Sequence, residues 1–224
     1  MCALYEVDEA GTAELMQLAR EAREQGWWTQ YEDLDLYPYI GLEQEASAIT
    51  HYGMHYVSAL LQTEDYAREI IKAVLPKIAP PVLEDRIKAR LHRQQLLERE
   101  NPPRYRVLLD EAVLHRTVGS AALMAAQLAK IVDTVRAGKA AVQIIPFTVG
   151  AYSAADSMFI LLEFSESLLS PVVYVEALTI SQYYERATDV AHYRESVEQL
   201  RDCALSPRES LQLLEDMQRA YLSK

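Results

Sequence analysis

The sequence has few of the residues on which several classes of protein depend. Only two cysteines occur in 224 residues, Cys2 and Cys203, so a disulfide framework is excluded and a reducing environment is expected. No apolar run approaches the roughly 20 residues that a membrane helix needs, and the acidic N-terminus has no apolar signal core. We therefore expect a cytoplasmic protein that is neither secreted nor inserted in a membrane.

Basic residues are also scarce, with 22 Lys and Arg against 33 Asp and Glu and a net charge of −11. Nonspecific affinity for nucleic acid comes mainly from Lys and Arg at phosphates, so we predict that this chain alone does not bind duplex DNA at physiological salt. The sequence also lacks a Gly-rich phosphate loop, a nucleophile elbow, a zinc-ligand cysteine cluster and a kinase signature. We expect no cofactor and no metal, and any enzymatic chemistry would depend on carboxylates, tyrosines and histidines.

Short runs rich in β-branched and aromatic residues are present, and they indicate strands. Three of them follow one another at 141–147, 157–164 and 171–176. The middle run, SMFILLEF, is apolar without alternation at Met158–Leu162, which predicts a strand covered on both faces at the centre of a small sheet. Tyr105–Leu109 alternates as a further strand, and Thr179–Tyr183 is a candidate edge strand.

Helical periodicity and capping residues dominate the rest of the chain. Thr63 is a predicted N-cap with Glu64 and Asp65 in the first turn, and Ser206–Glu209 is a capping box with Pro at the first helical position. The predicted helices cover residues 12–25, 42–51, 63–76, 80–100 and 119–137, and two more follow residue 185.

These elements predict a single α+β domain over residues 1–224, helix-dominated, with a small four- or five-stranded sheet packed against helices. Its parts are a linker helix with an aromatic segment (1–40), a helical part (41–104), a sheet part with one long helix (105–184) and a C-terminal helical pair (185–224). The apolar Leu, Tyr and Met of the C-terminal helices favour a homodimer, since two-fold dimers are the commonest assembly.

Nine short segments in order match a known pattern. They are Arg23–Trp28 (REQGWW), Tyr39–Ala46 (YIGLEQEA), Leu60–Arg68 (LLQTEDYAR), Arg90–Gln95 (RLHRQQ), Leu109–Leu114 (LDEAVL), Gln127–Ala129 (QLA), Gln143–Phe147 (QIIPF), Phe159–Phe164 (FILLEF) and Val173–Glu176 (VYVE). In this order and spacing, from about Leu4 to Leu222, the chain resembles the C-terminal domain of unknown function of actinobacterial XRE-type helix-turn-helix transcriptional regulators. Those regulators are often described as antitoxin-like and are commonly found beside a small partner protein.

The resemblance implies an effector domain that binds a small molecule or a small partner protein. The 224 residues contain no counterpart of the helix-turn-helix domain that precedes this region in the family. Two positions depart from the family pattern: Ser58-Ala59 stands where Pro-Gly is usual, and Tyr152 stands where a histidine is usual. These changes indicate a retuned pocket. The alternative is a standalone member recruited as a small-molecule enzyme, with acid–base or cyclisation chemistry, in specialised metabolism.

Three carboxylates at strand ends are the first candidates for chemistry. Glu111, Glu163 and Glu176 would converge if their strands were neighbours, and a shared site would raise at least one pKa. If the protein is an enzyme, we expect Glu111, Glu176 and Tyr152 to be its catalytic residues. The alternative is that each carboxylate caps a helix or pairs with an arginine. The arginines considered for this are Arg90, Arg93 and Arg116.

We predict a pocket between the sheet and the helices, with the 146–157 loop as its lid. Glu43, Gln62 and Tyr66 would lie inside it, because polar residues on inward-packing segments must be satisfied or meet a ligand. The full set of candidate ligand-binding residues is Trp28, Glu43, Gln62, Tyr66, Gln127, Tyr152, Glu163 and Glu176.

Several of these candidates also have a structural interpretation. Trp27, Trp28 and Tyr31 would form an aromatic wall for a ligand or fix the N-terminal helix to the core. Gln127 falls on the same helix face as Met124 and Ile131, so we expect it to be buried with backbone or ligand partners, backbone being favoured. In the long loop, Tyr152, Ser153 and Asp156 are the binding candidates. His51 and His55, four residues apart, would share a metal on a helix, but no third ligand lies nearby and a solvated pair is the simpler interpretation.

Overall fold

The computed structural model describes residues 26–31, 37–165 and 169–224, and within them the chain is α+β with seven α-helices and a six-stranded mixed sheet. The strands are β1 (Ala48–Gly53), β2 (Arg104–Asp110), β3 (Ala141–Ile145), β4 (Phe159–Glu163), β5 (Val172–Glu176) and β6 (Ser181–Tyr184). Their order is β3-β2-β1-β4-β5-β6, with β1 parallel to β2, β2 parallel to β3, and the other neighbours antiparallel. The predicted count of four or five strands was too low.

The helices enclose this sheet. They are α2 (Tyr37–Glu45), α3 (Glu64–Val74), α4 (Pro80–Gln94), α5 (Ala112–His115), α6 (Ala121–Arg136), α7 (Ala187–Cys203) and α8 (Pro207–Leu222), with short 3-10 turns η2 (Trp27–Gln30), η3 (Ala59–Leu61), η4 (Gln95–Glu98) and η5 (Phe147–Val149). Both predicted caps are confirmed: the Thr63 hydroxyl accepts from the Tyr66 amide, and Ser206 and Glu209 form the capping box. The helix predicted over 12–25 lies outside the described residues.

The missing strand was β1, and here the prediction of a helix over 42–51 was wrong. Helix α2 ends at Glu45, and Ala48–Gly53 then pairs with β2 on one side and β4 on the other. Its sequence, AITHYG, has the β-branched and aromatic residues that suit a strand. The two-residue period places Ile49 in the core cluster of α3, α4 and α6, and Tyr52 in the cluster of α7. The segment 41–104 is therefore not wholly helical.

The predicted central position of SMFILLEF is confirmed, because β4 lies beside β1 in the middle of the sheet. Leu162 packs in the larger core cluster and Leu161 in the smaller one, so both faces of β4 are covered. Pairing with β1 and β5 satisfies the backbone of β4 on both sides.

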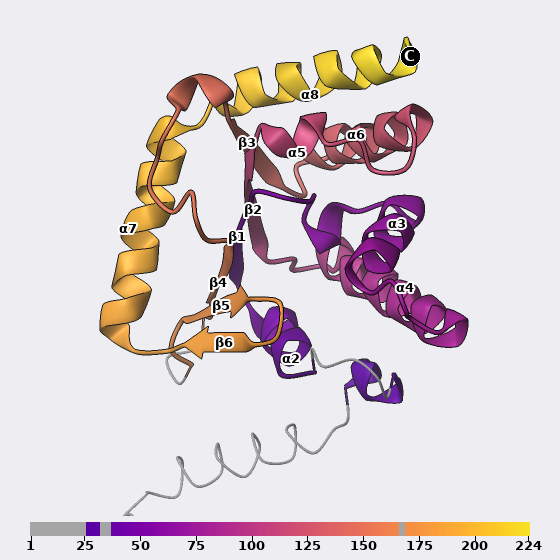
Figure 1. The fold of residues 1–224 in the computed structure, drawn as a ribbon. Helices are drawn as coiled ribbons and strands as arrows, with labels where there is room; N and C mark the ends of the chain where they lie inside the picture. The colour runs from indigo at the N-terminus through magenta and orange to yellow at the C-terminus, as the bar shows by residue number, and fades with distance from the viewer. Residues whose placement is uncertain (1–25, 32–36, 166–168) are drawn as a thin grey trace, which may run out of the picture.

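The two faces of the sheet are covered unequally (Figure 1). The parallel β1–β2 and β2–β3 connections carry α3 to α6, so these helices share one face, where α6 also packs against α8. Helix α7 covers the opposite face, where Val190, Val197 and Leu200 are buried against β4 and β5. None of the helices in the described part of the chain has both the length and the hydrophobicity of a transmembrane span.

Candidate functional site

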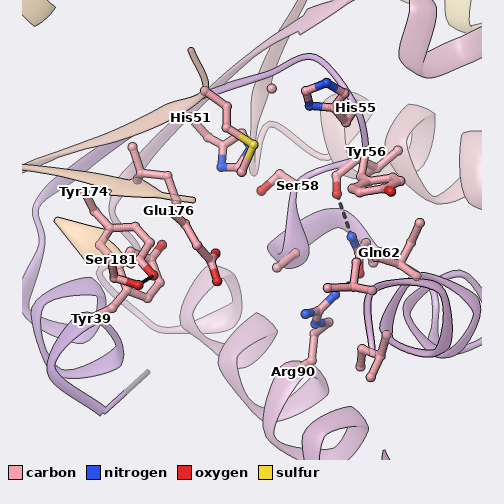
Figure 2. Close-up of a pocket in the computed structure, with 18 of the residues that line it drawn as sticks. Tyr39, His51, His55, Tyr56, Ser58, Gln62, Arg90, Tyr174, Glu176 and Ser181 are labelled. Carbon is pink, nitrogen blue, oxygen red and sulfur yellow. Dashed lines mark hydrogen bonds between the residues drawn. The ribbon is translucent and has the colours of Figure 1, made fainter. Parts of the chain in front are cut away.

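A cavity of about 680 Å³ lies between the sheet and helices α3 and α4 (Figure 2). Its wall includes the end of β1 with the loop that follows, the start of β4 and the end of β5. These strand ends lie at one edge of the sheet, since β1 and β5 run in the same direction and β4 runs opposite to both. The volume is in the range of small-molecule sites, about 300–1,000 Å³.

Much of the cavity wall is apolar, and helix α3 shows why. Its strong amphipathic pattern buries Ile70 and Ile71 against the neighbouring elements, and both side chains line the cavity together with Val74. Met158 and Ile160 provide apolar surface from the sheet side. An apolar body of a ligand would therefore meet hydrophobic side chains from two layers of the fold.

Polar groups enter this apolar cavity at Gln62 and Arg90. The Gln62 side chain is fully buried, and its amide nitrogen donates to the Val57 carbonyl at 2.6 Å. The Arg90 guanidinium on α4 donates to the Gln62 amide oxygen, also at 2.6 Å. Gln62 is thus held in one orientation by backbone on one side and arginine on the other (Figure 2).

A second set of polar side chains fixes the η3 turn that carries Gln62. The Gln94 amide donates to the Ala59 and Gln62 carbonyls, and the Lys130 ammonium donates to the Gln62 carbonyl at 2.7 Å. Gln127 accepts from the Thr63 amide at 2.8 Å and donates to the Leu61 carbonyl at 2.7 Å. The predicted burial of Gln127 with backbone partners is confirmed, and its position lies behind the cavity wall.

Helix α4 brings Arg86, Arg90 and Arg93 to the cavity, because their spacing places them on one helical face. Arg93 is neutralised by Glu43, with two bonds of 2.7 Å, and Glu43 also accepts from the Tyr39 hydroxyl at 2.7 Å. Burial opposes the charge of Arg93, but the Glu43 carboxylate outweighs it and the pKa of Arg93 is raised.

Arg90 has no such carboxylate within ion-pair distance among the described residues. Burial, and after it the charge of Arg93, lower the pKa of Arg90 to about 10, while Glu176 acts in the opposite direction. A partly buried guanidinium hydrogen-bonded to a neutral amide is a ready donor for an anion. The site therefore holds a positive charge aimed into an apolar cavity.

His51 lies on β1 with its side chain on the cavity wall (Figure 2). Burial, and after it the Arg93 charge, lower the pKa of His51 to about 4, so its imidazole is neutral at pH 7. His51 and His55 lie on a strand and the loop after it, not on one helix, so the spacing that suggested a shared metal does not apply. Within the described ranges, no group of three or more His, Cys, Asp or Glu side chains is placed to hold a metal ion.

The rim of the cavity is formed by the end of β5 and the turn into β6. Glu176 is exposed there, and Tyr174 lies buried two residues earlier on the same strand, with its hydroxyl 3.1 Å from that of Ser181. Burial is the main reason that the pKa of Tyr174 is raised to about 12. Of the predicted ligand-binding residues, Gln62 and Glu176 line this cavity.

Other residues that were predicted to share the pocket lie near it but outside its wall. Glu43 is engaged by Arg93 and Tyr39 at the inner end of α4. Tyr66 is fully buried, and its hydroxyl accepts from the Val57 amide at 3.3 Å. Trp28 packs edge-on against Trp27, which stacks on the His92 imidazole with a centroid distance of 3.8 Å. The aromatic segment thus packs against α4 and does not form a wall of the cavity.

The prediction that the 146–157 loop covers this pocket was wrong. Tyr152 packs in the α7 cluster on the other face of the sheet, where its hydroxyl donates to Asp110 and accepts from Tyr52 at 3.0 Å. Its partner Tyr52 lies on that face because Tyr52 follows the cavity residue His51 in β1, and consecutive strand residues point to opposite faces. Neither Ser153 nor Asp156 lines the cavity.

The predicted convergence of Glu111, Glu163 and Glu176 was also wrong. Glu163 lies at the far end of β4 and pairs with Arg194 on α7 at 2.7 Å. Glu111 follows β2, accepts from the Phe147 amide at 2.8 Å and lies 3.1 Å from His115. Three strand spacings of about 4.8 Å, or roughly 14 Å, separate the strands of Glu111 and Glu176. The pairing alternative therefore holds for Glu163.

From the sequence, Arg90 was predicted only as a partner for carboxylates and His51 only as a metal ligand, and Tyr174 was not predicted to have a role. The repeat of Arg86, Arg90 and Arg93 on one face of the RLHRQQ helix was the available signal for Arg90. Three basic side chains on a face that also carries buried residues call for an anion nearby. Tyr174 gave no such signal, since a tyrosine in a strand is ordinary.

Two comparisons with known proteins bear on this geometry. The comparison with curated proteins gives no match to this chain. The comparison with family models matches residues 36–216, which include β1 to β6 and every element that lines the cavity. Since the match covers most of the chain, the protein belongs to the family described as "Domain of unknown function (DUF5753)".

Proposed function

We propose that this protein is an effector domain that binds a small molecule in the cavity between the sheet and helices α3 and α4. By its resemblance to the actinobacterial helix-turn-helix regulators, it would be of the kind that regulates transcription when joined to a helix-turn-helix domain. The observation that carries the proposal is a cavity of about 680 Å³ with an apolar wall and a few polar groups: Gln62 and Arg90, which are hydrogen-bonded to each other, and Glu176 at the rim. Pockets of this composition are where ligands are generally found.

The departure from the family pattern at Ser58 supports the same site. Ser58 lines the cavity, and its hydroxyl is hydrogen-bonded to that of Tyr105 in the buried network around Arg93. A Pro-Gly pair at these positions would remove this hydroxyl and alter the turn before η3. The change therefore falls where it would alter the choice of ligand.

Binding is favoured over catalysis by the positions of the candidate acids and bases. Acid–base chemistry by Glu111, Tyr152 and Glu176 would need them in one site, but they lie after β2, on the α7 face and at the cavity rim. An enzyme built on this cavity would have His51, His55 and Glu176 as its titratable groups beside the arginines and tyrosines. No pair of them is hydrogen-bonded in the arrangement that activates a nucleophile.

The proposal includes no direct contact with DNA, because the net charge is −11. A gel shift with duplex DNA at physiological salt should show no binding, and micromolar, salt-sensitive affinity would contradict this. A homodimer remains our expectation for the assembly. Light scattering at tens of micromolar should then give twice the monomer mass, and a monomer mass would contradict the expectation.

The ligand site is tested by filling the cavity from its rim. Ala177 lines the cavity and is exposed in the β5–β6 turn, so Ala177→Trp adds bulk at the opening without disturbing the core. Thr179→Trp places the same ring in the same turn outside the cavity wall and is the matched control. A library of small metabolites is screened against wild type and both variants by thermal shift.

We expect at least one compound to raise the Tm of wild type and Thr179→Trp by several degrees but not that of Ala177→Trp. A ligand at 100 times its Kd stabilises by about 2.7 kcal/mol, which is well above the detection limit. The proposed function is wrong if no compound stabilises the wild type. It is also wrong if every active compound stabilises all three proteins equally.

A further inference from the structure

Two opposite charges line the cavity without meeting. Arg90 enters from α4 and Glu176 from the end of β5, and both side chains extend into the same space (Figure 2). No ion pair within 4.0 Å joins them or links either to another described residue, although the charge of Glu176 acts to raise the pKa of Arg90. Elsewhere, in contrast, the buried Arg93 meets Glu43 directly.

The Arg90 end of the cavity is built for an anion. Gln62 takes one N–H of the guanidinium and, through its own bond to Val57, fixes the direction of the group. The remaining N–H groups form a planar fork that matches a carboxylate with two parallel bonds. Burial disfavours the charged form of Arg90, and no described residue provides a carboxylate within ion-pair distance of it. An anionic ligand would provide that negative partner.

The Glu176 end is built for a cation. Its carboxylate stands at the exposed rim, and Tyr174 and Tyr183, whose rings are 5.2 Å apart, lie close enough for Glu176 to raise the pKa of both after burial has done so. An exposed carboxylate at the opening of the cavity attracts an ammonium group by charge. The rim of the cavity thus carries a negative charge, and its interior carries the positive charge of Arg90.

Between these two ends the wall is apolar, with Ile70 and Ile71 from α3 and Ile160 from β4. We propose that the cavity takes a zwitterion with an apolar body, of the size of a short peptide, whose carboxylate meets Arg90 and whose ammonium meets Glu176. This inference rests on the proposed ligand-binding function and specifies its chemical class. The ligand would complete the ion pairs that Arg90 and Glu176 do not make with each other.

Three probes with one apolar body and different charges test this. Leucyl-leucine carries both charges, N-acetyl-leucyl-leucine carries the anion alone, and leucyl-leucine amide carries the cation alone. Titration calorimetry should give leucyl-leucine at least about tenfold tighter binding than either derivative, since each derivative leaves one protein charge unpaired.

Single substitutions test which residue causes the preference for leucyl-leucine over each derivative. Arg90→Gln should remove the preference for leucyl-leucine over its amide, and Glu176→Gln should remove the preference over the N-acetyl form. Glu163→Gln, a carboxylate change at a strand end on the opposite face, should change neither preference. Circular dichroism and Tm of each variant show that it is folded.

The inference is overturned if either derivative binds wild type as tightly as leucyl-leucine, or if either preference survives in its variant. It is also overturned if no dipeptide form binds while other library compounds do so in the cavity. In that case the ligand-binding function stands and the ligand is of another class. If nothing stabilises wild type over Ala177→Trp, the proposed function itself fails, and the two failures are thereby distinguished.

Discussion

The two faces of the sheet use the same strands but treat charge and space differently. On the cavity face, Glu43 and Arg93 form an ion pair whose side chains are 1% and 7% exposed, beside an open volume of about 680 Å³. On the α7 face, Glu163 and Arg194 form a pair whose side chains are 34% and 49% exposed, and they line an open pocket of about 540 Å³.

This difference shows which face of the sheet is less stable than close apolar packing would make it. Burying an ion pair and leaving a cavity both reduce the free energy of unfolding relative to a filled apolar core. Among the described residues, the α7 face has no buried ion pair, and the pocket on that side is lined by charged side chains that remain near water. A protein selected for stability alone would have no reason to treat the faces differently, so the polar network on the cavity face supports a binding role there.

The largest expected effect on the free energy of unfolding comes from replacing the arginine of each ion pair by methionine. Arg93→Met leaves the Glu43 carboxylate buried without its cation, and we expect a loss of about 3–5 kcal/mol in the free energy of unfolding. Arg194→Met leaves Glu163 near solvent, and we expect about 0–1 kcal/mol. Urea unfolding of both variants measures the contrast. Equal losses would mean that the two pairs are equally solvated.

A second comparison uses consecutive residues of β4. Leu161 is buried in the α7 cluster, so Leu161→Ala should cost about 2–5 kcal/mol through lost burial and a new void. Phe159→Ala, on the same face, should fall in the same range. Ile160 borders the cavity and is only partly buried, so Ile160→Ala should cost about 1–2 kcal/mol because less buried surface is lost. An Ile160→Ala loss as large as that of Leu161→Ala would mean that the cavity is closed in solution.

The strands and caps that could be predicted were those with strong local signals. SMFILLEF was apolar enough to mark a strand buried on two faces, and Thr63 and Ser206 are capping residues whose side chains act within one helical turn. β1 was missed because Leu42–Glu45 is helical and no Gly or Pro separates it from AITHY. Its strand identity comes from pairing with β2 and β4, and this information lies more than 50 residues away in the sequence.

The site was predicted only in part for a related reason. Gln62 was found because a polar residue among apolar ones must be satisfied or meet a ligand, and Glu176 was found as a carboxylate at the end of a strand. Tyr152 was assigned to the wrong face, because its position depends on the loop after β3 passing to the α7 side of the sheet. Arg90 was undervalued, since the sequence alone does not tell which of three arginines on a helix lacks a carboxylate.

The third expected effect is a pH dependence specific to the cavity face. The pKa of His51 is about 4 in the folded protein and about 6.5 in an unfolded chain. The unfolded state therefore binds the proton first, and stability is lost as pH falls from about 6.5 to 4, by up to about 3 kcal/mol. His51→Gln should reduce the slope of stability against pH in this window, as measured by urea unfolding.

The matched control for His51 is His192→Gln, at an exposed position on α7. It should leave the wild-type slope in place. If His51→Gln has the same slope as wild type, the imidazole of His51 is accessible to solvent in the folded state, and the cavity would be open to water at that wall.

The smallest expected effect separates stability from binding with two hydroxyl deletions. Tyr152→Phe removes a donor to Asp110 and an acceptor for Tyr52 on the α7 face, so it should cost about 1 kcal/mol. Dipeptide binding should not change, because Tyr152 lies outside the cavity wall. Tyr174→Phe removes a hydroxyl at the cavity rim that is bonded to Ser181, and there we expect weaker binding with a similar or smaller loss of stability.

Thermal unfolding and calorimetry of the Tyr152→Phe and Tyr174→Phe pair measure both quantities. Weaker dipeptide binding by Tyr152→Phe would mean that the two faces are coupled through β1, whose Tyr52 and His51 are adjacent in the chain and face opposite sides. In that event, the binding of a ligand in the cavity would change the packing on the α7 face. Unchanged binding in Tyr152→Phe with reduced binding in Tyr174→Phe would confine recognition to the cavity face. The sheet would then act as a rigid partition between a face that binds and a face that stabilises.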